Sequence, residues 1–257
     1  MILSFRKWIF RVWYWYVNRV DKNAEILFMN YGYKFTGDQI ELEPADEPNR
    51  YSVQLYHLLG SSASIAGKQI AEIGCGRGGG LSYIVRTFAP ASAKGIDIST
   101  SAVNFCRKNY DLEGLTFAIG DAQDLSFMQD NSLDIIINCE SSHRYPRMDL
   151  FFKEVYRILR PGASLLYTDF GFDHEMAGIL KMIDESGLTI TKEAMITDNV
   201  VKALEADDDR RRNLVKRLTP GFLRKQAFNF AGNVGGETYN LFATNKYNYF
   251  FYVLQKR

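Results

Sequence analysis

The stretch Glu72-Ile73-Gly74-Cys75-Gly76-Arg77-Gly78-Gly79-Gly80 decides the fold of this chain. It follows a short apolar run that begins at Gln69 and precedes a helix-like segment over residues 81–88, so it indicates a tight turn from a buried strand into a helix. Glycines suit such a turn because a side chain would hold the backbone away from a bound nucleotide, and because some turn positions take a positive φ. The glycines fit both G-x-G-x-G and the dinucleotide pattern G-x-G-x-x-G, so neighbouring residues must identify the ligand.

Three carboxylates around this turn narrow the choice of ligand. Asp97 closes the next strand-like run, about 20 residues beyond the glycines, where it can accept hydrogen bonds from two ribose hydroxyls. Glu72 precedes the first glycine, and Asp121 ends the third strand-like run. Because carboxylates attract hydrogen-bond donors and repel phosphate oxygens, Glu72 and Asp121 favour a ligand with an ammonium group and an exocyclic amine over one with a pyrophosphate. S-adenosylmethionine fits that description.

In order and spacing, four motifs resemble those of the class I S-adenosylmethionine-dependent methyltransferases. They are the first motif Glu72–Gly78, the ribose-binding strand end Gly95–Ser99, the adenine-binding turn Gly120–Ala122, and the turn Leu159–Gly162 before the fifth strand. The resemblance covers roughly residues 30–170 and is closest to the phthiotriol dimycocerosates methyltransferases and similar lipid or natural-product O-methyltransferases. Segments that look like this subgroup are Ala45–Arg50, Leu55–His57 and Ser142–Pro146.

The resemblance implies S-adenosylmethionine as cofactor and a set of residues that bind it. The candidate cofactor-binding residues are Tyr33, Glu72, Gly74, Gly76, Asp97, Ile98, Asp121, Ala122 and Asn138. Tyr33 belongs to the segment Phe28–Tyr33, which resembles the part of many relatives that folds over the methionine end of the cofactor. Its hydroxyl is a candidate donor to the cofactor carboxylate, and the alternative is an aromatic side chain packed in a loop.

Residues 69–170 alternate strand-like and helix-like segments, which predicts a parallel sheet with helices on both faces. The expected strands are 69–74, 92–97, 115–119, 133–139 and 163–169, and the expected helices are 79–88, 100–110 and 148–159. Beyond them we expect a helix at 175–186, a sixth strand at 188–194, and a last strand at 247–255 that the resemblance implies is antiparallel. The expected fold is therefore an α/β, Rossmann-like sheet of seven strands, mostly parallel.

Length favours a single domain over residues 1–257, and the resemblance implies that it is a methyltransferase domain. Within it we expect an N-terminal helical lid (1–60), a cofactor-binding core (61–195), a substrate-pocket insertion (196–246) and the last strand (247–257). The formal net charge of +1 argues against a nucleic-acid substrate. Cys75, Cys106 and Cys139 are odd in number and lack metal-ligand spacing, so we expect no metal site and a reducing, cytoplasmic compartment.

Two side chains near the expected sheet edge are candidates for catalysis. His143 follows the fourth strand, and a histidine at this edge could act as general base toward a substrate oxygen near neutral pH. The alternative is a loop histidine bonded to a backbone carbonyl. Asp169 ends the fifth strand on the same side, where it could orient the base or cap the following turn. His57 lies on an expected helix over residues 48–59, where a structural role is favoured over catalysis.

Each of two segments outside the core, residues 1–20 and the insertion 196–246, allows two interpretations. Residues 1–20 combine five tryptophan and tyrosine side chains with basic ones, which indicates an amphipathic helix. It could be a lid or subunit contact, or it could bind a membrane surface. In the insertion, Asp207–Arg212 is expected to form an exposed, ion-paired helix face. Aromatic residues follow it and either line a lipophilic pocket or pack in the core, namely Phe222, Phe228, Phe230, Tyr239 and Phe242.

The function that these features favour is methylation of a hydroxyl on a hydrophobic lipid, polyketide or other natural product. A second hypothesis keeps the cofactor but methylates nitrogen or carbon of an alkaloid or quinone. A third is a non-catalytic cofactor-binding protein, which the full set of cofactor residues and the candidate base argue against. The expected partner is a hydrophobic small molecule, and the chain is expected to be a monomer or a homodimer.

Overall fold

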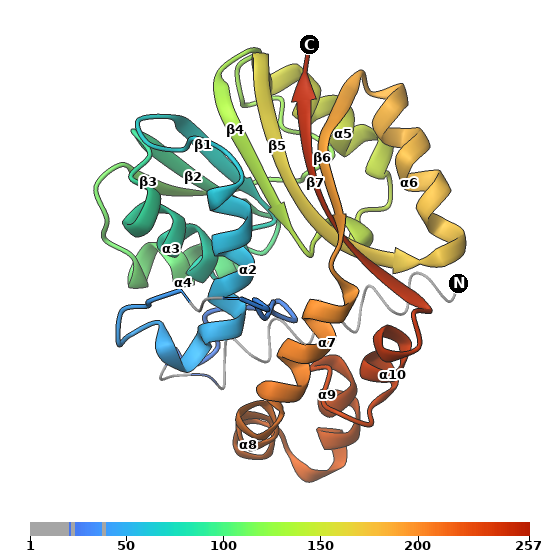
Figure 1. Ribbon diagram of the computed structural model, residues 1–257. Coiled ribbons are helices and arrows are strands. Elements are labelled where there is room, and N and C mark those ends of the chain that lie inside the picture. The colour runs from blue at the N-terminus through green and yellow to red at the C-terminus, as the bar shows by residue number, and fades with distance from the viewer. Residues whose placement is uncertain (1–20, 22–23, 38–39) are drawn as a thin grey trace.

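The computed structural model describes residues 21, 24–37 and 40–257, and the predictions for residues 1–20 lie outside this part of the chain. A seven-stranded sheet forms its centre (Figure 1), with the strand order β3-β2-β1-β4-β5-β7-β6. The strands are β1 (Gln69–Ile73), β2 (Ser92–Asp97), β3 (Leu115–Ile119), β4 (Leu133–Cys139), β5 (Leu159–Phe172), β6 (Leu188–Met195) and β7 (Tyr247–Lys256). The last strand, β7, is antiparallel to both of its neighbours, and β1 to β5 pair in parallel. The predicted sheet is confirmed.

Helices cover both faces of the sheet, as predicted. The helices on one face are α2 (Arg50–Ser61), α3 (Gly79–Phe88) and α4 (Thr100–Asn109), and those on the other are α5 (Met148–Ile158) and α6 (Asp173–Glu185). Each face has its own apolar cluster, because alternate side chains of a strand point to opposite sides of the sheet. In β4, for example, Ile137 packs with Leu55 and Ile84, whereas Ile136 packs with Phe151.

Four short helices form the segment between β6 and β7, where the insertion over residues 196–246 is expected. They are α7 (Thr197–Ala206), α8 (Asp208–Leu218), α9 (Arg224–Phe230) and α10 (Glu237–Ala243). Figure 1 shows them beyond the carboxyl ends of the parallel strands, the edge where ligands bind in open α/β sheets. Val200, Leu204 and Phe242 extend one of the core clusters into this group of helices. None of the helices in the described residues has the length and hydrophobicity that a membrane-spanning segment needs.

The prediction of an exposed charged face on Asp207–Arg212 is wrong for Asp207 and Arg211. Asp207 and Arg211 are buried and joined by an ion pair of 2.9 Å. Arg211 also donates to the backbone carbonyls of Tyr31 and Ala231, at 2.9 Å each. The guanidinium has five donors, so it can satisfy carbonyls from two segments that are distant in sequence, which explains its burial. The predicted local ion pairing itself is confirmed.

Several element boundaries differ from the predicted ones by a few residues, among them those of α2 and β5. The helix expected to end at Gly60 starts with a single 3₁₀ turn (Glu47–Asn49) and continues through Gly60 to Ser61. Glycine fits inside α2 because a Cβ there would lie 2.4 Å from the ring of Phe88 on α3, so the missing side chain permits close helix packing. Strand β5 begins at Leu159, within the expected turn, and extends to Phe172.

Candidate active site

The glycine motif forms the predicted turn between β1 and α3. Gly74, Gly76 and Gly78 have φ of +79°, +52° and +75°, conformations that favour glycine. A Cβ on Gly74 would also lie 2.3 Å from the Ser141 hydroxyl oxygen, so a side chain is excluded there by both strain and contact. Apart from its two chain neighbours, no residue among 21, 24–37 and 40–257 has an atom within 4 Å of the corresponding position at Gly76, which leaves one side of the turn open to a ligand.

Asp97 holds this turn from the end of β2. Its Oδ2 accepts a hydrogen bond from the Gly76 N–H at 2.9 Å, and its Oδ1 accepts one from the Ser99 N–H at 2.8 Å. Burial raises the pKa of Asp97, because the charged form loses hydration, and the two backbone donors oppose that shift. Each carboxylate oxygen has two lone pairs, so both can accept a further hydrogen bond from a ligand hydroxyl.

Two buried polar side chains beneath the turn keep one unpaired atom each. Glu72 is fully buried, and its Oε1 accepts a hydrogen bond from the Tyr56 hydroxyl at 2.6 Å. Asn138 donates from Nδ2 to the Ile73 carbonyl at 2.9 Å and to the Ser141 hydroxyl at 2.8 Å. Glu72 Oε2 and Asn138 Oδ1 have no hydrogen-bond partner among residues 21, 24–37 and 40–257. Buried polar atoms are normally satisfied, so these two acceptors indicate a missing ligand with donor groups.

Exposed apolar side chains gather at the carboxyl ends of β2 and β3. Ile98, Ile119 and Phe127 are 69%, 47% and 51% exposed, and Phe127 lies over the backbone of Gly120. Beside them, Asp121 Oδ1 accepts bonds from the backbone and side-chain amides of Gln123, each at 2.9 Å. An apolar wall next to a carboxylate suits a flat base with an exocyclic amine. The sequence motifs identified Ile98 and Asp121 but gave no signal for Ile119 or Phe127.

The geometry fits the predicted cofactor, because open glycine backbone, carboxylates at three strand ends and unpaired buried acceptors occur at one edge of the sheet. The segment before α2 also crosses this edge, since the Leu27 carbonyl would lie 2.6 Å from a Cβ on Gly79. Two of the predicted cofactor-binding residues pack against other side chains. Ala122 is buried in the core cluster, and Tyr33 packs edge-to-face on Phe35 with a ring-centroid distance of 4.9 Å. Their contacts with the cofactor stay predictions.

The structure brings the two predicted catalytic residues together. His143 Nδ1 lies 2.6 Å from Asp169 Oδ1, although 26 residues separate them in sequence. Asp169 Oδ2 accepts from the Ser142 hydroxyl at 2.6 Å and from the His143 N–H at 3.0 Å. Burial acts to raise the pKa of Asp169, but His143 and the hydrogen-bond donors outweigh it and hold this pKa below its usual value. An ionised Asp169 therefore fixes the imidazole orientation, with the proton on Nδ1.

Arg144 contacts the other imidazole nitrogen. Its Nε donates to His143 Nε2 at 3.1 Å, so Nε2 is the acceptor of this contact. The His143 ring also lies against Phe170, with ring centroids 4.5 Å apart. Arg144 falls in a motif that resembles the O-methyltransferase subgroup, but nothing in the sequence indicated that it would contact the base. Both residues lie in the 3₁₀ turn Ser142–Arg144.

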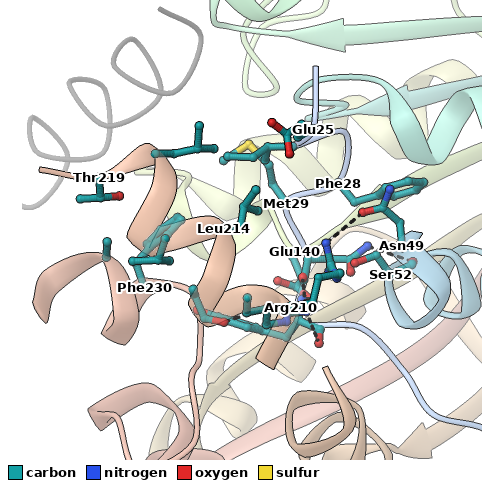
Figure 2. Close-up of a pocket in the computed structure, with 18 of the residues that line it drawn as sticks. Glu25, Phe28, Met29, Asn49, Ser52, Glu140, Arg210, Leu214, Thr219 and Phe230 are labelled. Carbon is teal, nitrogen blue, oxygen red and sulfur yellow. Dashed lines mark hydrogen bonds between the residues drawn. The ribbon is translucent and has the colours of Figure 1, made fainter. Parts of the chain in front are cut away.

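A cavity lies against Arg144 and Phe170, the two residues that contact the His143 ring (Figure 2), and its empty space of about 950 Å³ includes open solvent. Its walls come from residues 25–31, Asn49 and Ser52 at the start of α2, helices α8 and α9, and the three residues Glu140, Arg144 and Phe170. Most of the lining is apolar, for example Met29, Leu214 and Phe230. Such a cavity suits a lipophilic ligand whose polar end reaches the few polar groups.

Three of the five aromatic residues predicted for a pocket have different surroundings. Phe230 lines the cavity. Phe242 is fully buried in the core, so the packing alternative is correct for it. Phe222 is 81% exposed and lines neither the cavity nor the core. For His57, the expected structural role is supported by its Nδ1, which lies 2.8 Å from the Tyr83 hydroxyl.

Comparison with known proteins agrees with this geometry. A family model described as "Methyltransferase domain" matches residues 71–167. The chain is 42% identical over 212 residues to a fatty-acid O-methyltransferase of Mycolicibacterium smegmatis, covering 82% of this chain and 77% of the relative. It is 35% identical over 251 residues to a phthiotriol/phenolphthiotriol dimycocerosates methyltransferase of Mycobacterium tuberculosis, covering 97% of this chain and 93% of the relative.

Solved structures share the fold at low sequence identity. The geranyl diphosphate C-methyltransferase from Streptomyces coelicolor A3(2), solved with S-adenosyl-L-homocysteine, superposes with a TM-score of 0.69 at 14% identity. The match covers 93% of this chain and 95% of that chain. Extensive similarity to named methyltransferases, the matching domain model and a site that fits the cofactor lead to one conclusion. The chain belongs to the class I S-adenosylmethionine-dependent methyltransferases.

Proposed function

We propose that this methyltransferase methylates an oxygen atom of a hydrophobic small molecule that binds in the cavity of Figure 2, with His143 as general base. The observation that carries the proposal is the His143–Asp169 pair, held at 2.6 Å, whose imidazole contacts Arg144 and Phe170 on the wall of a largely apolar cavity. The names of the two similar proteins support a lipid acceptor, since one acts on fatty acids and the other on phthiotriol dimycocerosates.

The cofactor-binding residues are proposed from the same edge of the sheet. Gly74 and Gly76 would admit the cofactor to the turn, and Asp97 would accept hydrogen bonds from its ribose. Glu72 and Asn138 would accept from the amino-acid end, whereas Ile98, Asp121 and Ala122 would contact the base and Tyr33 the carboxylate. Bound S-adenosylmethionine supplies an activated methyl group on a positively charged sulfur.

The chain's own residues would prepare the acceptor oxygen. For an alcohol, the hydroxyl would donate to His143 Nε2 and lose its proton to that nitrogen as the new carbon–oxygen bond forms. Asp169 would stabilise the resulting imidazolium through Nδ1. Arg144 occupies Nε2 in this structure, so the incoming hydroxyl must displace that contact before proton transfer.

The contact between Arg144 and His143 favours a second candidate, a carboxylic acid that is converted to its methyl ester. A carboxylate already offers a lone pair and needs no general base, whereas it does need a cationic partner. Arg144 lies on the cavity wall and could provide that partner. The name of the 42% identical relative, a fatty-acid O-methyltransferase, supports this alternative.

A methyl-transfer assay with a lipophilic extract tests the proposal, with product mass and attachment atom as the readout. Transfer to nitrogen or carbon, or no transfer, would overturn it. His143→Ala should lower turnover of an alcohol about 100-fold or more and leave S-adenosylhomocysteine affinity nearly unchanged. For a carboxylic acid, His143→Ala should retain turnover with a flat pH profile, and Arg144→Met should instead raise the acceptor KM.

A further inference from the structure

Glu140 is a buried carboxylic acid that the proposed mechanism does not use. It directly follows β4 and is only 8% exposed, yet it lines the cavity beside Arg144 and Phe170. Its φ of +48° lies in the left-handed region, which is uncommon for a residue with a long side chain. Such conformations persist only where surrounding contacts hold them, and they concentrate at functional sites.

Those contacts involve one oxygen of the carboxyl group. Oε1 accepts a hydrogen bond from the Tyr31 N–H at 2.7 Å and another from the Tyr249 hydroxyl. Oε2 receives no hydrogen bond from any residue that the structure describes, and it is not among the fully enclosed unpaired atoms. The carboxyl group is therefore fixed in orientation through Oε1, and Oε2 is the oxygen that can face the cavity.

We propose that Glu140 is a specificity-determining residue that donates a hydrogen bond from Oε2 to the oxygen of the acceptor. The proposal rests on the proposed function, because it assumes a hydrophobic oxygen acceptor in this cavity. An alcohol would accept from Glu140 while donating to His143 Nε2, so that its lone pair and its proton are both positioned. A carboxylate would accept from Glu140 at one oxygen and from Arg144 at the other.

The environment of Glu140 supports the protonated form that donation requires. Burial raises the pKa of Glu140 to about 8, and the charge of Asp169 acts in the same direction. The hydrogen bonds from Tyr249 and Tyr31 and the charge of Arg211 on α8 oppose this shift. Arg144 and Arg210 are the further cationic side chains on the cavity wall. Because Oε1 already accepts two hydrogen bonds, the proton belongs on Oε2.

Binding of defined probes tests this role without relying on turnover. The probes are 1-dodecanol and dodecanoic acid, titrated calorimetrically into the full chain saturated with S-adenosylhomocysteine at pH 7 and pH 9. Glu140→Leu should weaken binding of the preferred probe about tenfold at pH 7, the equivalent of one well-made hydrogen bond. Glu140→Gln keeps an acceptor for Tyr31 and Tyr249 and a donor toward the cavity, so its affinity should stay within about threefold of wild type.

The pH dependence separates donation from mere structural support. Wild-type affinity should fall as the pH rises through about 8, because the deprotonated carboxylate cannot donate, whereas Glu140→Gln should bind equally at pH 7 and pH 9. Tyr249→Phe removes one support of Oε1 but leaves Oε2 in place, so it should change affinity less than threefold. If Glu140→Leu fails to fold, the comparison of wild type with Glu140→Gln decides the matter.

The possible failures are distinguishable. Wild-type binding of neither probe would overturn the proposed function, and this inference with it. Wild-type binding that Glu140→Leu shares, or a loss that Tyr249→Phe reproduces, would overturn the inference and leave the proposed function intact. An equal pH dependence in wild type and Glu140→Gln would exclude Glu140 as the titrating donor.

Discussion

Asp97 is the side chain through which β2 holds the glycine turn, so it is where cofactor affinity can be tested separately from catalysis. Asp97→Ala removes acceptors for the Gly76 and Ser99 N–H groups as well as the proposed contact with the ribose. Hydrogen bonds to a charged group contribute about 1.5–3 kcal/mol each, so we expect S-adenosylhomocysteine to bind at least about tenfold more weakly. Isothermal titration calorimetry measures this directly.

His143→Ala is the control for that experiment. It also truncates a side chain at a strand end, but His143 contacts Asp169, Arg144 and Phe170 rather than the glycine turn. Cofactor affinity should therefore be retained in His143→Ala and lost in Asp97→Ala. Equal affinity in both variants would contradict the assignment of Asp97 to the cofactor site.

The packing of α2 on α3 depends on the small size of Gly80. A Cβ at this position would lie 1.8 Å from the ring of Tyr56, whose hydroxyl holds Glu72 beneath the turn. Gly80→Ala should therefore displace the ring and destabilise the protein by about 1–3 kcal/mol, as expected for an overpacked core. Alanine's higher helix propensity cannot compensate for this contact. Thermal or urea unfolding measures the change.

Gly178 in α6 gives a matched comparison, because no described residue beyond its own stretch of helix has an atom within 4 Å of the position that its Cβ would take. Gly178→Ala should stabilise the protein by about 0.4–1 kcal/mol through helix propensity and reduced freedom of the unfolded chain. The two substitutions are chemically identical, so their opposite signs would isolate the contact with Tyr56. A stabilising Gly80→Ala would show that α2 and α3 can separate without cost.

Two buried carboxylic acids make the stability of the protein dependent on pH. Burial raises the pKa of Glu72, like that of Glu140, to about 8, and both groups would titrate near 4.5 when unfolded. Between these values the folded protein retains protons that the unfolded chain has released. The free energy of unfolding should therefore decrease as the pH rises from about 4.5 to about 8, by up to about 1.4 kcal/mol per pH unit for each carboxyl group.

Glu72→Gln tests this linkage, because an amide of the same shape can still accept from Tyr56 but cannot ionise. Urea unfolding at several pH values between 5 and 8 should give a shallower loss of stability for Glu72→Gln than for wild type. Parallel curves for the two proteins would show that Glu72 does not titrate in this range. S-adenosylhomocysteine is omitted from these measurements, since a bound ligand adds its own stabilisation.

The sequence by itself determined the parts of this protein that depend on local geometry. Positive φ at Gly74 and Gly76 confines those positions to glycine, so the turn is visible in the sequence. Apolar runs of strand length separated by helical segments likewise predicted the sheet. Asp97 was predictable because it closes the strand after that turn and holds Gly76 in the structure.

Only the tertiary structure decided which side chains meet across distant segments. The pairs His143–Asp169 and Glu140–Tyr249 are separated by 26 and 109 residues, and Arg211 is buried because it reaches carbonyls 180 residues earlier. No local pattern distinguishes a buried Arg211 from the exposed ion pair that its sequence predicted. The physical reason is that burial and protonation depend on the packing of separate elements, whereas sequence periodicity reports the conformation of one element at a time.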